Sequence, residues 1–372
     1  PVEPGLYKLK VKSPPAGRAG EKLKVGGLAT RFMLTVEISS IYSKAGKVRR
    51  IHNLIFAPSI EIAEKINAQL GWLGNLKSDG RPILGLDSEE LAKIVFGIDP
   101  ACVIVPAHAW TPWFSIFGSM SGFDSIEECF GKFTPQIFAI ETGLSSDPAM
   151  NWRLSKLDAL ALISNSDSHS LQRIGREANV FEGELSYEGI IGAIRSRDPK
   201  QFLFTVEFFP AEGKYHYDGH SEHKVRMSPE ETRKAKGKCP TCGRPVTVGV
   251  MNRVEALADR PAGEKPGGVV PFKSMVPLDE IIAEAVGMGV SAKKVKEEYL
   301  NLVKAVGSEF RALLEAKESE LKAVTNPEVV EGILRVRQGR VHIEPGYDGV
   351  YGKVKIFEEG ERIGASRQKT LF

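Results

Sequence analysis

The chain has 372 residues, enough for one large domain with one or two small ones, and its hydrophobic fraction of 42% is ordinary for a globular protein. The formal net charge of +3 is too small to identify a partner. No apolar run approaches the roughly 20 residues of a membrane-spanning helix, and no secretion signal is recognisable, so composition excludes a membrane protein and predicts a cytoplasmic one. Pro1-Val2-Glu3-Pro4 resembles the middle of a loop, and we expect residues to be missing upstream.

The first half of the chain alternates between strand-like and helix-like segments. Ser59 stands where a helix cap is expected, and Ile62, Ile66 and Leu70 recur at helical spacing. Such alternation predicts a parallel α/β architecture, either open or closed into a barrel. The expected strands are 32–38, 51–56, 102–106, 137–141 and 161–164, and the expected helices are 59–70, 88–96 and 187–195.

The second half begins where this alternation stops, at Glu212. Short polar segments rich in Lys, His and Cys run to about residue 249, and residues 259–268 form a Gly- and Pro-rich loop. Residues 278–324 carry apolar stripes at helical spacing, and 329–357 resemble a hairpin. We therefore predict four parts: 1–211 as the α/β domain, 212–260 as a small metal-binding domain, 261–358 as a C-terminal helical domain, and 359–372 as an unstructured tail.

Five potential metal ligands lie in or just after predicted strands, where barrel and open α/β folds build their sites. A lone His at a strand end is more often a hydrogen-bonded structural residue, but five such positions together indicate a site. Carboxylate and imidazole suit zinc, manganese or iron, and paired ions can bind a phosphate and activate water. We expect two or three divalent metals, with magnesium as a further candidate. The five ligands are Glu37, His52, His108, Asp167 and His169.

These residues resemble the ligands of the polymerase-and-histidinol-phosphatase (PHP) family of phosphoesterases. The family's Glu, His, His and terminal Asp-x-His match Glu37, His52, His108, Asp167 and His169 in order. The resemblance implies a distorted β/α barrel with several metals at one mouth, where Asp167, His169 and His108 are catalytic. The chain departs from the family in lacking its opening His-x-His strand.

Three segments resemble more narrowly the endonuclease Q group of this family and its bacterial relatives, which are often labelled helicase-like. They are 106–113 (PAHAWTPW), 141–147 (ETGLSSD) and 174–179 (IGREAN). No Gly-rich loop ending in Gly-Lys-Ser/Thr occurs, which excludes a helicase motor. The resemblance implies a DNA repair endonuclease that cuts 5′ to uracil, hypoxanthine, xanthine or an abasic site, near the nucleoid. Two alternatives remain open: a PHP phosphoesterase of a small phosphorylated metabolite, and a non-catalytic protein that binds DNA or a clamp.

Reading a damaged base usually requires a pocket with aromatic walls and polar partners. For the walls we consider Trp110, Trp113, Phe114 and Trp152, with core or rim packing as the alternative interpretation. For contacts to phosphate or base we consider Ser145, Ser146, Asn151 and Arg153, with a solvated loop as the alternative.

Two pairs of residues, His220 with His223 and Cys239 with Cys242, have the spacing of a closed tetrahedral zinc site. The Cys-Pro-x-Cys-Gly sequence is typical of a zinc knuckle, and a structural zinc is predicted there. His216 is close enough in sequence to compete with His220. Four protein ligands leave no open position, so we expect no catalytic role for them. Because this part stands next to the expected nuclease domain, we expect it to hold DNA. Cys102 and Cys129 are expected to be buried.

The tail carries Gln368, Leu371 and Phe372, in the order found in short peptides that dock on the sliding clamp. A motif this short also occurs by chance. Residues 335–340 are basic and fit either contact with DNA phosphates or a solvated face. We predict that the C-terminal helical domain, 261–358, binds DNA.

Overall fold

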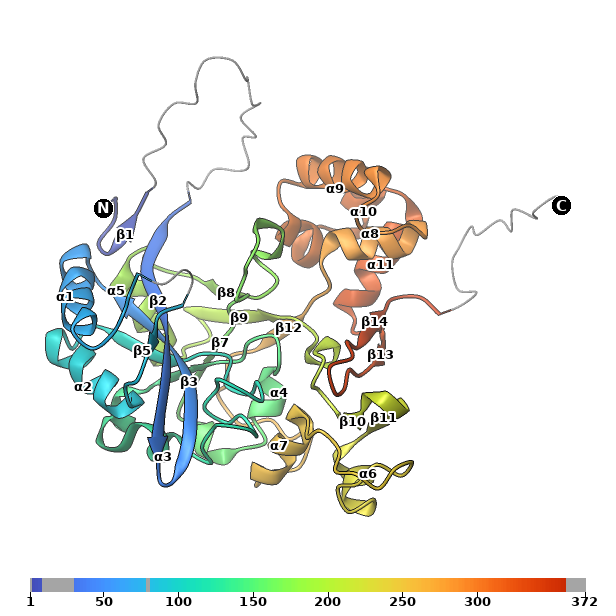
Figure 1. Cartoon of the computed structure of the whole chain (residues 1–372). Helices are drawn as coiled ribbons and strands as arrows, with labels where there is room; N and C mark the ends of the chain where they lie inside the picture. Colours follow the sequence, from blue (N-terminus) through green and yellow to red (C-terminus); the bar gives the residue numbers. More distant parts are fainter. Residues whose placement is uncertain (1, 9–29, 78–80, 359–372) are drawn as a thin grey trace, which may run out of the picture. The chain divides into compact units, whose positions relative to one another are not determined.

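The computed structural model describes residues 2–8, 30–77 and 81–358, which form two compact units (Figure 1). Of these residues, 2–8, 30–273 and 345–352 make up the first unit, and 274–344 with 353–358 make up the second. The Cys- and His-rich segment 212–260 therefore belongs to the first unit and has no compact unit of its own.

The first unit is built on a long antiparallel hairpin of β2 (Phe32–Lys44) and β3 (Lys47–Ala57). The strands are joined by Ala45 and Gly46, whose φ angles of 53° and 72° define a type I′ turn, which matches the twist of paired strands. β5 (Val103–Pro106) continues the sheet, also antiparallel, on the other side of β3. The expected parallel order is wrong here, because a two-residue turn reverses the chain and leaves no room for a crossover.

The remaining strands of the first unit form short ladders of mixed direction. β6 and β7 pair in parallel, β8 and β9 pair antiparallel, and β12 lies on the other side of β9. Among the described residues these ladders do not join into one closed barrel, and the architecture is a mixed α/β fold. The short strands are β1 (Leu6–Tyr7), β4 (Ile83–Leu84), β6 (Ala139–Glu141), β7 (Ala161–Ile163), β8 (Ala178–Phe181), β9 (Phe202–Glu207), β10 (Asp218–His220), β11 (Val225–Met227) and β12 (Phe272–Ser274).

Every α-helix of the first unit except the last begins at a side-chain cap that the sequence supplies. Ser59 caps α1 by accepting a hydrogen bond from the Ile62 amide, and Ile66 and Leu70 form the buried face, as predicted. In Figure 1, α1 and α2 lie beside the sheet. The helices are α1 (Ile60–Gly71), α2 (Ser88–Ile98), α3 (Ile126–Phe130), α4 (Pro148–Asn151), α5 (Tyr187–Ser196), α6 (Pro229–Lys234) and α7 (Val250–Leu257).

The core of the first unit lies between this sheet and its helices. Ile51, Ile55 and Ile104 are at most 1% exposed, and Trp110 stacks at a tilt on Phe117 with 4.9 Å between ring centroids. Burial on this scale fixes the register of the hairpin, because a slip of one residue would turn every core side chain outward.

The second unit is helical, as predicted for 278–324, with breaks between α8 (Leu278–Val286), α9 (Lys293–Val306), a π-helical turn (Arg311–Glu315) and α10 (Glu318–Lys322). The predicted hairpin over 329–357 is wrong in its first part. Val329, Ile333 and Val336 recur at helical spacing and are buried in α11 (Pro327–Arg337), which Asn326 caps. Only β13 (His342–Glu344) and β14 (Lys353–Lys355) form an antiparallel pair.

Candidate active site

The hairpin β2–β3 carries the first two predicted ligands on one face. In its register Glu37 pairs with Leu54 and Ser39 pairs with His52, so Glu37 and His52 are diagonal neighbours on adjacent strands. Their side chains meet, with 2.8 Å between Glu37 Oε1 and His52 Nδ1. Two residues that are 15 positions apart in sequence are thus brought together by strand pairing alone.

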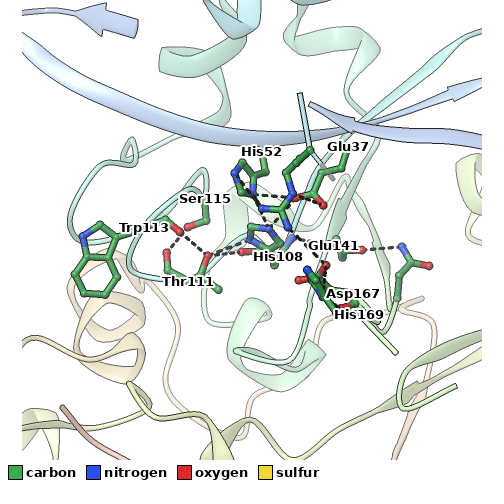
Figure 2. A network of polar contacts seen from close by, with 11 residues as sticks. Glu37, His52, His108, Thr111, Trp113, Ser115, Glu141, Asp167 and His169 are labelled. Atoms are coloured by element: carbon green, nitrogen blue, oxygen red, sulfur yellow. Dashed lines mark hydrogen bonds and ion pairs between the residues drawn. The ribbon is translucent and has the colours of Figure 1, made fainter. Parts of the chain in front are cut away.

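His108 joins this pair from the segment after β5. The Ala107 amide donates to the His52 carbonyl at 3.0 Å, which extends the β3–β5 ladder up to the site. His108 Nε2 then lies 3.2 Å from Glu37 Oε1 and 3.1 Å from His52 Nδ1 (Figure 2). The His108 backbone has a positive φ of 29°, and its amide donates to buried Glu141 at 2.7 Å. A strained backbone held in place by a buried carboxylate is typical of functional residues.

Burial and contact set the charges of the three side chains. Burial raises the pKa of Glu37, but hydrogen bonds with His108 and His52 outweigh it and hold that pKa well below its usual range. Burial lowers the pKa of His52. For His108 burial acts in the same direction, but the contact with Glu37 and the charge of Glu141 raise its pKa above the ordinary value. Glu37 is therefore a carboxylate at neutral pH.

Asp167 and His169 follow β7 on an exposed segment near the same site (Figure 2). Asp167 has a positive φ of 43°, and its side chain is 36% exposed, whereas that of His169 is 76% exposed. His169 Nδ1 lies 3.9 Å from Asp167 Oδ1. These two residues stand outside the tight group formed by the other three predicted ligands.

The donor atoms of Glu37, His52 and His108 all lie within 4.8 Å of one another. One carboxylate oxygen and two imidazole nitrogens make a donor set suited to zinc, manganese or iron, and the low pKa of Glu37 keeps the oxygen charged. The chemistry and spacing of these residues therefore fit a divalent ion. Of the five predicted ligands, three are brought together, and Asp167 and His169 lie beside them.

Arg81 is a site residue that the sequence reasoning missed. Its Nε lies 3.0 Å from Glu37 Oε2, its Nη1 lies 3.0 Å from His52 Nδ1, and its Nη2 lies 4.0 Å from Asp167 Oδ1. Arg81 stands just before the short β4, in a segment without helical or strand periodicity. No sequence signal placed it beside a strand end, so only the folded structure reveals it.

Buried carboxyl groups lie behind the site and were also missed. Glu141, Glu177 and Glu207 are at most 3% exposed. Burial raises the pKa of Glu207 to about 8, although Thr205 and Thr142 donate hydrogen bonds to it. Burial also raises the pKa of Glu177, and the nearby Glu207 adds to the effect. Two such groups are held largely uncharged at neutral pH.

The prediction of DNA contacts is wrong for Trp110, Ser146 and Asn151, because all three are buried to 1% exposure or less. Trp110 Nε1 donates to Asn151 Oδ1 at 2.8 Å, and Asn151 Nδ2 donates to Ser146 Oγ at 3.2 Å. This chain of hydrogen bonds satisfies polar groups inside the core. The aromatic and polar character that suggested a base pocket reflects packing here.

Arg153 is also engaged inside the protein, since it pairs with Glu255 at 2.7 Å and its side chain is only 12% exposed. Phe114 lies against His52 with 4.8 Å between ring centroids, on the border of the site. The roles suggested for Phe114 and for Trp113, Ser145 and Trp152, which are partly exposed, stay predictions.

The second predicted cluster comes together around β10. His223 Nδ1 lies 3.0 Å from His220 Nδ1 and 3.8 Å from Cys239 Sγ, and Cys242 Sγ lies 3.4 Å from His220 Nδ1. Burial opposes ionisation of the Cys239 thiol, but hydrogen bonds from His220 and from the amides of 241–242 lower its pKa to about 6. The spacing fits four ligands around one zinc ion.

His216 does not belong to this cluster. Its ring is buried against Tyr217 with 5.4 Å between ring centroids, and burial lowers its pKa to about 4. The structure therefore favours His220 over His216 as the partner of His223. The predicted clamp-binding residues Gln368, Leu371 and Phe372 lie outside the described residues.

The fold is similar to that of two lesion-directed endonuclease structures. The chain is similar to the lesion-specific endonuclease PfuEndoQ from Pyrococcus furiosus, with a TM-score of 0.81 and 29% identity, covering 96% of this chain and 82% of that one. It is equally similar to endonuclease Q bound to a 27-mer duplex with an abasic lesion at its active site, with a TM-score of 0.79, 29% identity, and coverage of 96% and 83%.

Sequence relatives include the MJ0043 protein of Methanocaldococcus jannaschii, which is 33% identical over 308 residues, or 78% of this chain. This chain spans 38% of the length of that relative. The YqxK protein of Bacillus subtilis is 28% identical over 342 residues, covering 90% of this chain and 81% of YqxK. The MJ0043 C-terminal domain family matches residues 277–340, within the second unit.

No helix in the described ranges is long and apolar enough to cross a membrane.

Proposed function

We propose that this protein is a divalent-metal-dependent endonuclease that repairs DNA. The observation that carries the proposal is the cluster of Glu37, His52 and His108, within 4.8 Å of one another, in a fold similar to lesion-specific endonucleases. Following the resemblance to the PHP family, Asp167 and His169 would complete the ligand set for two or three ions. The bond cut lies 5′ to uracil, hypoxanthine, xanthine or an abasic site.

Divalent ions held here would polarise the phosphate and lower the pKa of a water molecule. The residues of the chain prepare the site for that chemistry. Glu37 is kept ionised by His108 and His52, and burial favours the neutral form of His52, in which one ring nitrogen is free to act as a ligand. Arg81, partly exposed beside Glu37 and Asp167, brings a guanidinium that suits the charge of a phosphodiester.

The cluster of His220, His223, Cys239 and Cys242 supports a structural zinc in the same proposal. Four ligands would close the coordination sphere, so this ion would stabilise the loop and take no part in hydrolysis. The segment around it would hold DNA next to the cut. The tail residues Gln368, Leu371 and Phe372 would dock on a sliding clamp, a proposal that rests on their sequence alone.

The test uses labelled duplexes that contain uracil, hypoxanthine, xanthine or an abasic site, incubated with the protein and Mn²⁺ or Mg²⁺. The expected result is one nick on the 5′ side of the lesion and none in an undamaged duplex of the same sequence. Asp167→Asn should abolish nicking, whereas His342→Ala, an exposed His of the second unit, should cut like the parent. If no lesion-dependent nick forms, or Asp167→Asn cuts as well as the parent, the proposal is wrong.

A further inference from the structure

The segment from Asp167 to Ile174 is exposed along its whole length, and it carries two kinds of side chain. Asp167 and His169 face the site, and beyond them Leu171 is 82% exposed and Ile174 is 67% exposed. Large apolar side chains with so little cover cost free energy in water. Two of them directly beside candidate metal ligands call for a functional explanation.

Both ends of this segment are held firmly. Asn165 Nδ2 donates to Glu141 Oε1 at 2.8 Å, and Asn179 Nδ2 donates to the Ser164 carbonyl at 2.8 Å, which ties the two ends together. Just after the segment, Glu177 is only 3% exposed. The exposed residues therefore lie on a turn whose two ends are fixed by hydrogen bonds.

The backbone of the turn places the two apolar side chains together. Residues Leu171–Arg173 form one 3₁₀-helical turn that ends at Ile174. In a 3₁₀-helix the side chains at positions i and i+3 eclipse each other, so Leu171 and Ile174 share one side. The Cα atoms of residues two positions apart are separated by at most about 7 Å, so the Cα of Leu171 lies within about 7 Å of the Cα of His169.

We propose that Leu171 and Ile174 form a wedge that enters the base stack of duplex DNA beside the lesion. This inference rests on the proposed function. A phosphodiester held at Asp167 and His169 brings its own bases against the same turn, because successive nucleotides of a strand rise by about 3.4 Å. Apolar side chains inserted between bases are a general means of unstacking a duplex, and they fill the space that an extruded nucleotide leaves.

The test compares the parent with the double variant Leu171→Ala/Ile174→Ala. A matched control is Ile60→Ala, which removes another exposed apolar side chain, at the start of α1. Each protein is given the same uracil in a duplex and in a single strand, and the two cutting rates are measured. In parallel, 2-aminopurine next to the lesion reports unstacking by its fluorescence, with Ca²⁺ replacing the reactive metal.

The wedge predicts that the double variant lowers the ratio of duplex to single-strand cutting by about tenfold and loses the fluorescence rise, while Ile60→Ala changes neither. An unchanged ratio, or an equal loss on both substrates, overturns the wedge and leaves the nuclease proposal intact. If the parent raises fluorescence but cuts nothing, and the double variant does not raise it, the wedge stands and the nuclease proposal fails. If the parent neither raises the fluorescence nor cuts, the wedge proposal and the nuclease proposal both fail.

Discussion

The two clusters of candidate metal ligands rest on very different amounts of hydrophobic core. Glu37 and His52 project from a hairpin whose core residues, such as Ile38, Ile51 and Ile55, are at most 2% exposed. Around the His- and Cys-containing cluster the buried apolar residues are Met227, Cys239 and Val246, and Cys239 is itself a candidate ligand.

This difference indicates two different uses of a bound metal ion. A cluster built on a large core is already in place before any ion arrives, so binding free energy there is available for chemistry. A cluster in a thin segment obtains its order from the ion, and the binding free energy becomes folding free energy. Four predictions test this contrast.

The largest effect is expected at the proposed zinc site around β10. Cys242→Ser should lose the ion, and amide hydrogen exchange over residues 218–247 should rise to the rate of an open loop. Structural zinc contributes on the order of 10 kcal/mol to the folding of small metal-dependent domains. Without the ion, this segment should therefore lose its ordered structure completely, and the loss should be confined to the segment. Glu230→Gln, in the same segment but with an exposed side chain that pairs with Lys234 and contacts none of the four ligands, should keep both zinc and protection. Full protection of these amides from exchange in zinc-free Cys242→Ser would show that the segment does not depend on an ion for its order.

At the other cluster, Glu37→Gln should remove function and spare the fold. Loss of the central carboxylate should reduce metal content, measured by elemental analysis, and cut nicking by at least about 100-fold, since weaker supporting partners already cost that much. Circular dichroism should stay that of the parent because the core is untouched, and the melting temperature should fall only modestly, through loss of the charged contacts of Glu37 with His52 and His108. A protein that unfolds on this change would show that the first cluster also depends on its ion.

Glu207→Gln should change how stability depends on pH. The unfolded carboxyl group has a pKa near 4.5, and the folded one near 8. Between these values the unfolded state releases a proton that the folded state keeps, so stability of the parent falls as pH rises, by about 1.4 kcal/mol per pH unit. The variant lacks this contribution, so its stability should fall less steeply with pH than that of the parent, and urea unfolding at pH 5 and pH 8 measures the difference. If the free energy of unfolding depends on pH in the same way in parent and variant, the pKa of Glu207 is not raised in the folded state.

Gly143→Ala should cost about 1–3 kcal/mol of backbone strain. Gly143 has a φ of +60°, and an added Cβ would lie 2.6 Å from the His108 Cβ, so the variant should also lose nicking. Gly97→Ala, in α2 with open space around the added atom, should be neutral or stabilising. Thermal melts and nicking rates of the two variants give the comparison, and equal behaviour would show that Gly143 does not position His108.

Local sequence signals predicted a large part of this structure. The cap at Ser59 and the apolar spacing after it defined α1, and the paired spacing of His220, His223, Cys239 and Cys242 identified a group that the fold brings together. Glu37, His52 and His108 were found from their positions at strand ends and from family resemblance. Each of these signals lies within a short stretch of chain or a single motif.

The features that were missed depend on contacts between distant segments. Arg81 reaches Glu37 and His52 from a segment without periodicity, and nothing in its neighbourhood marks it. Trp110 was assigned to a base pocket because aromatic residues suit both a pocket and a core, and only its burial decides between them. The antiparallel pairing of β2 with β3 follows from a turn of two residues, whereas the alternation of strands and helices favoured parallel pairing.

That turn has a consequence for how related sequences can vary. Ala45 and Gly46 set the pairing along the whole hairpin, and with it the alignment of Glu37 and His52 eight or fewer positions away. One residue inserted there would either bulge out or turn His52 to the opposite face of the sheet. Lengthening each strand by a residue leaves the pairing intact. Homologues that keep Glu37 and His52 should therefore differ in this connection by even numbers of residues, a pattern that sequence comparison alone can check.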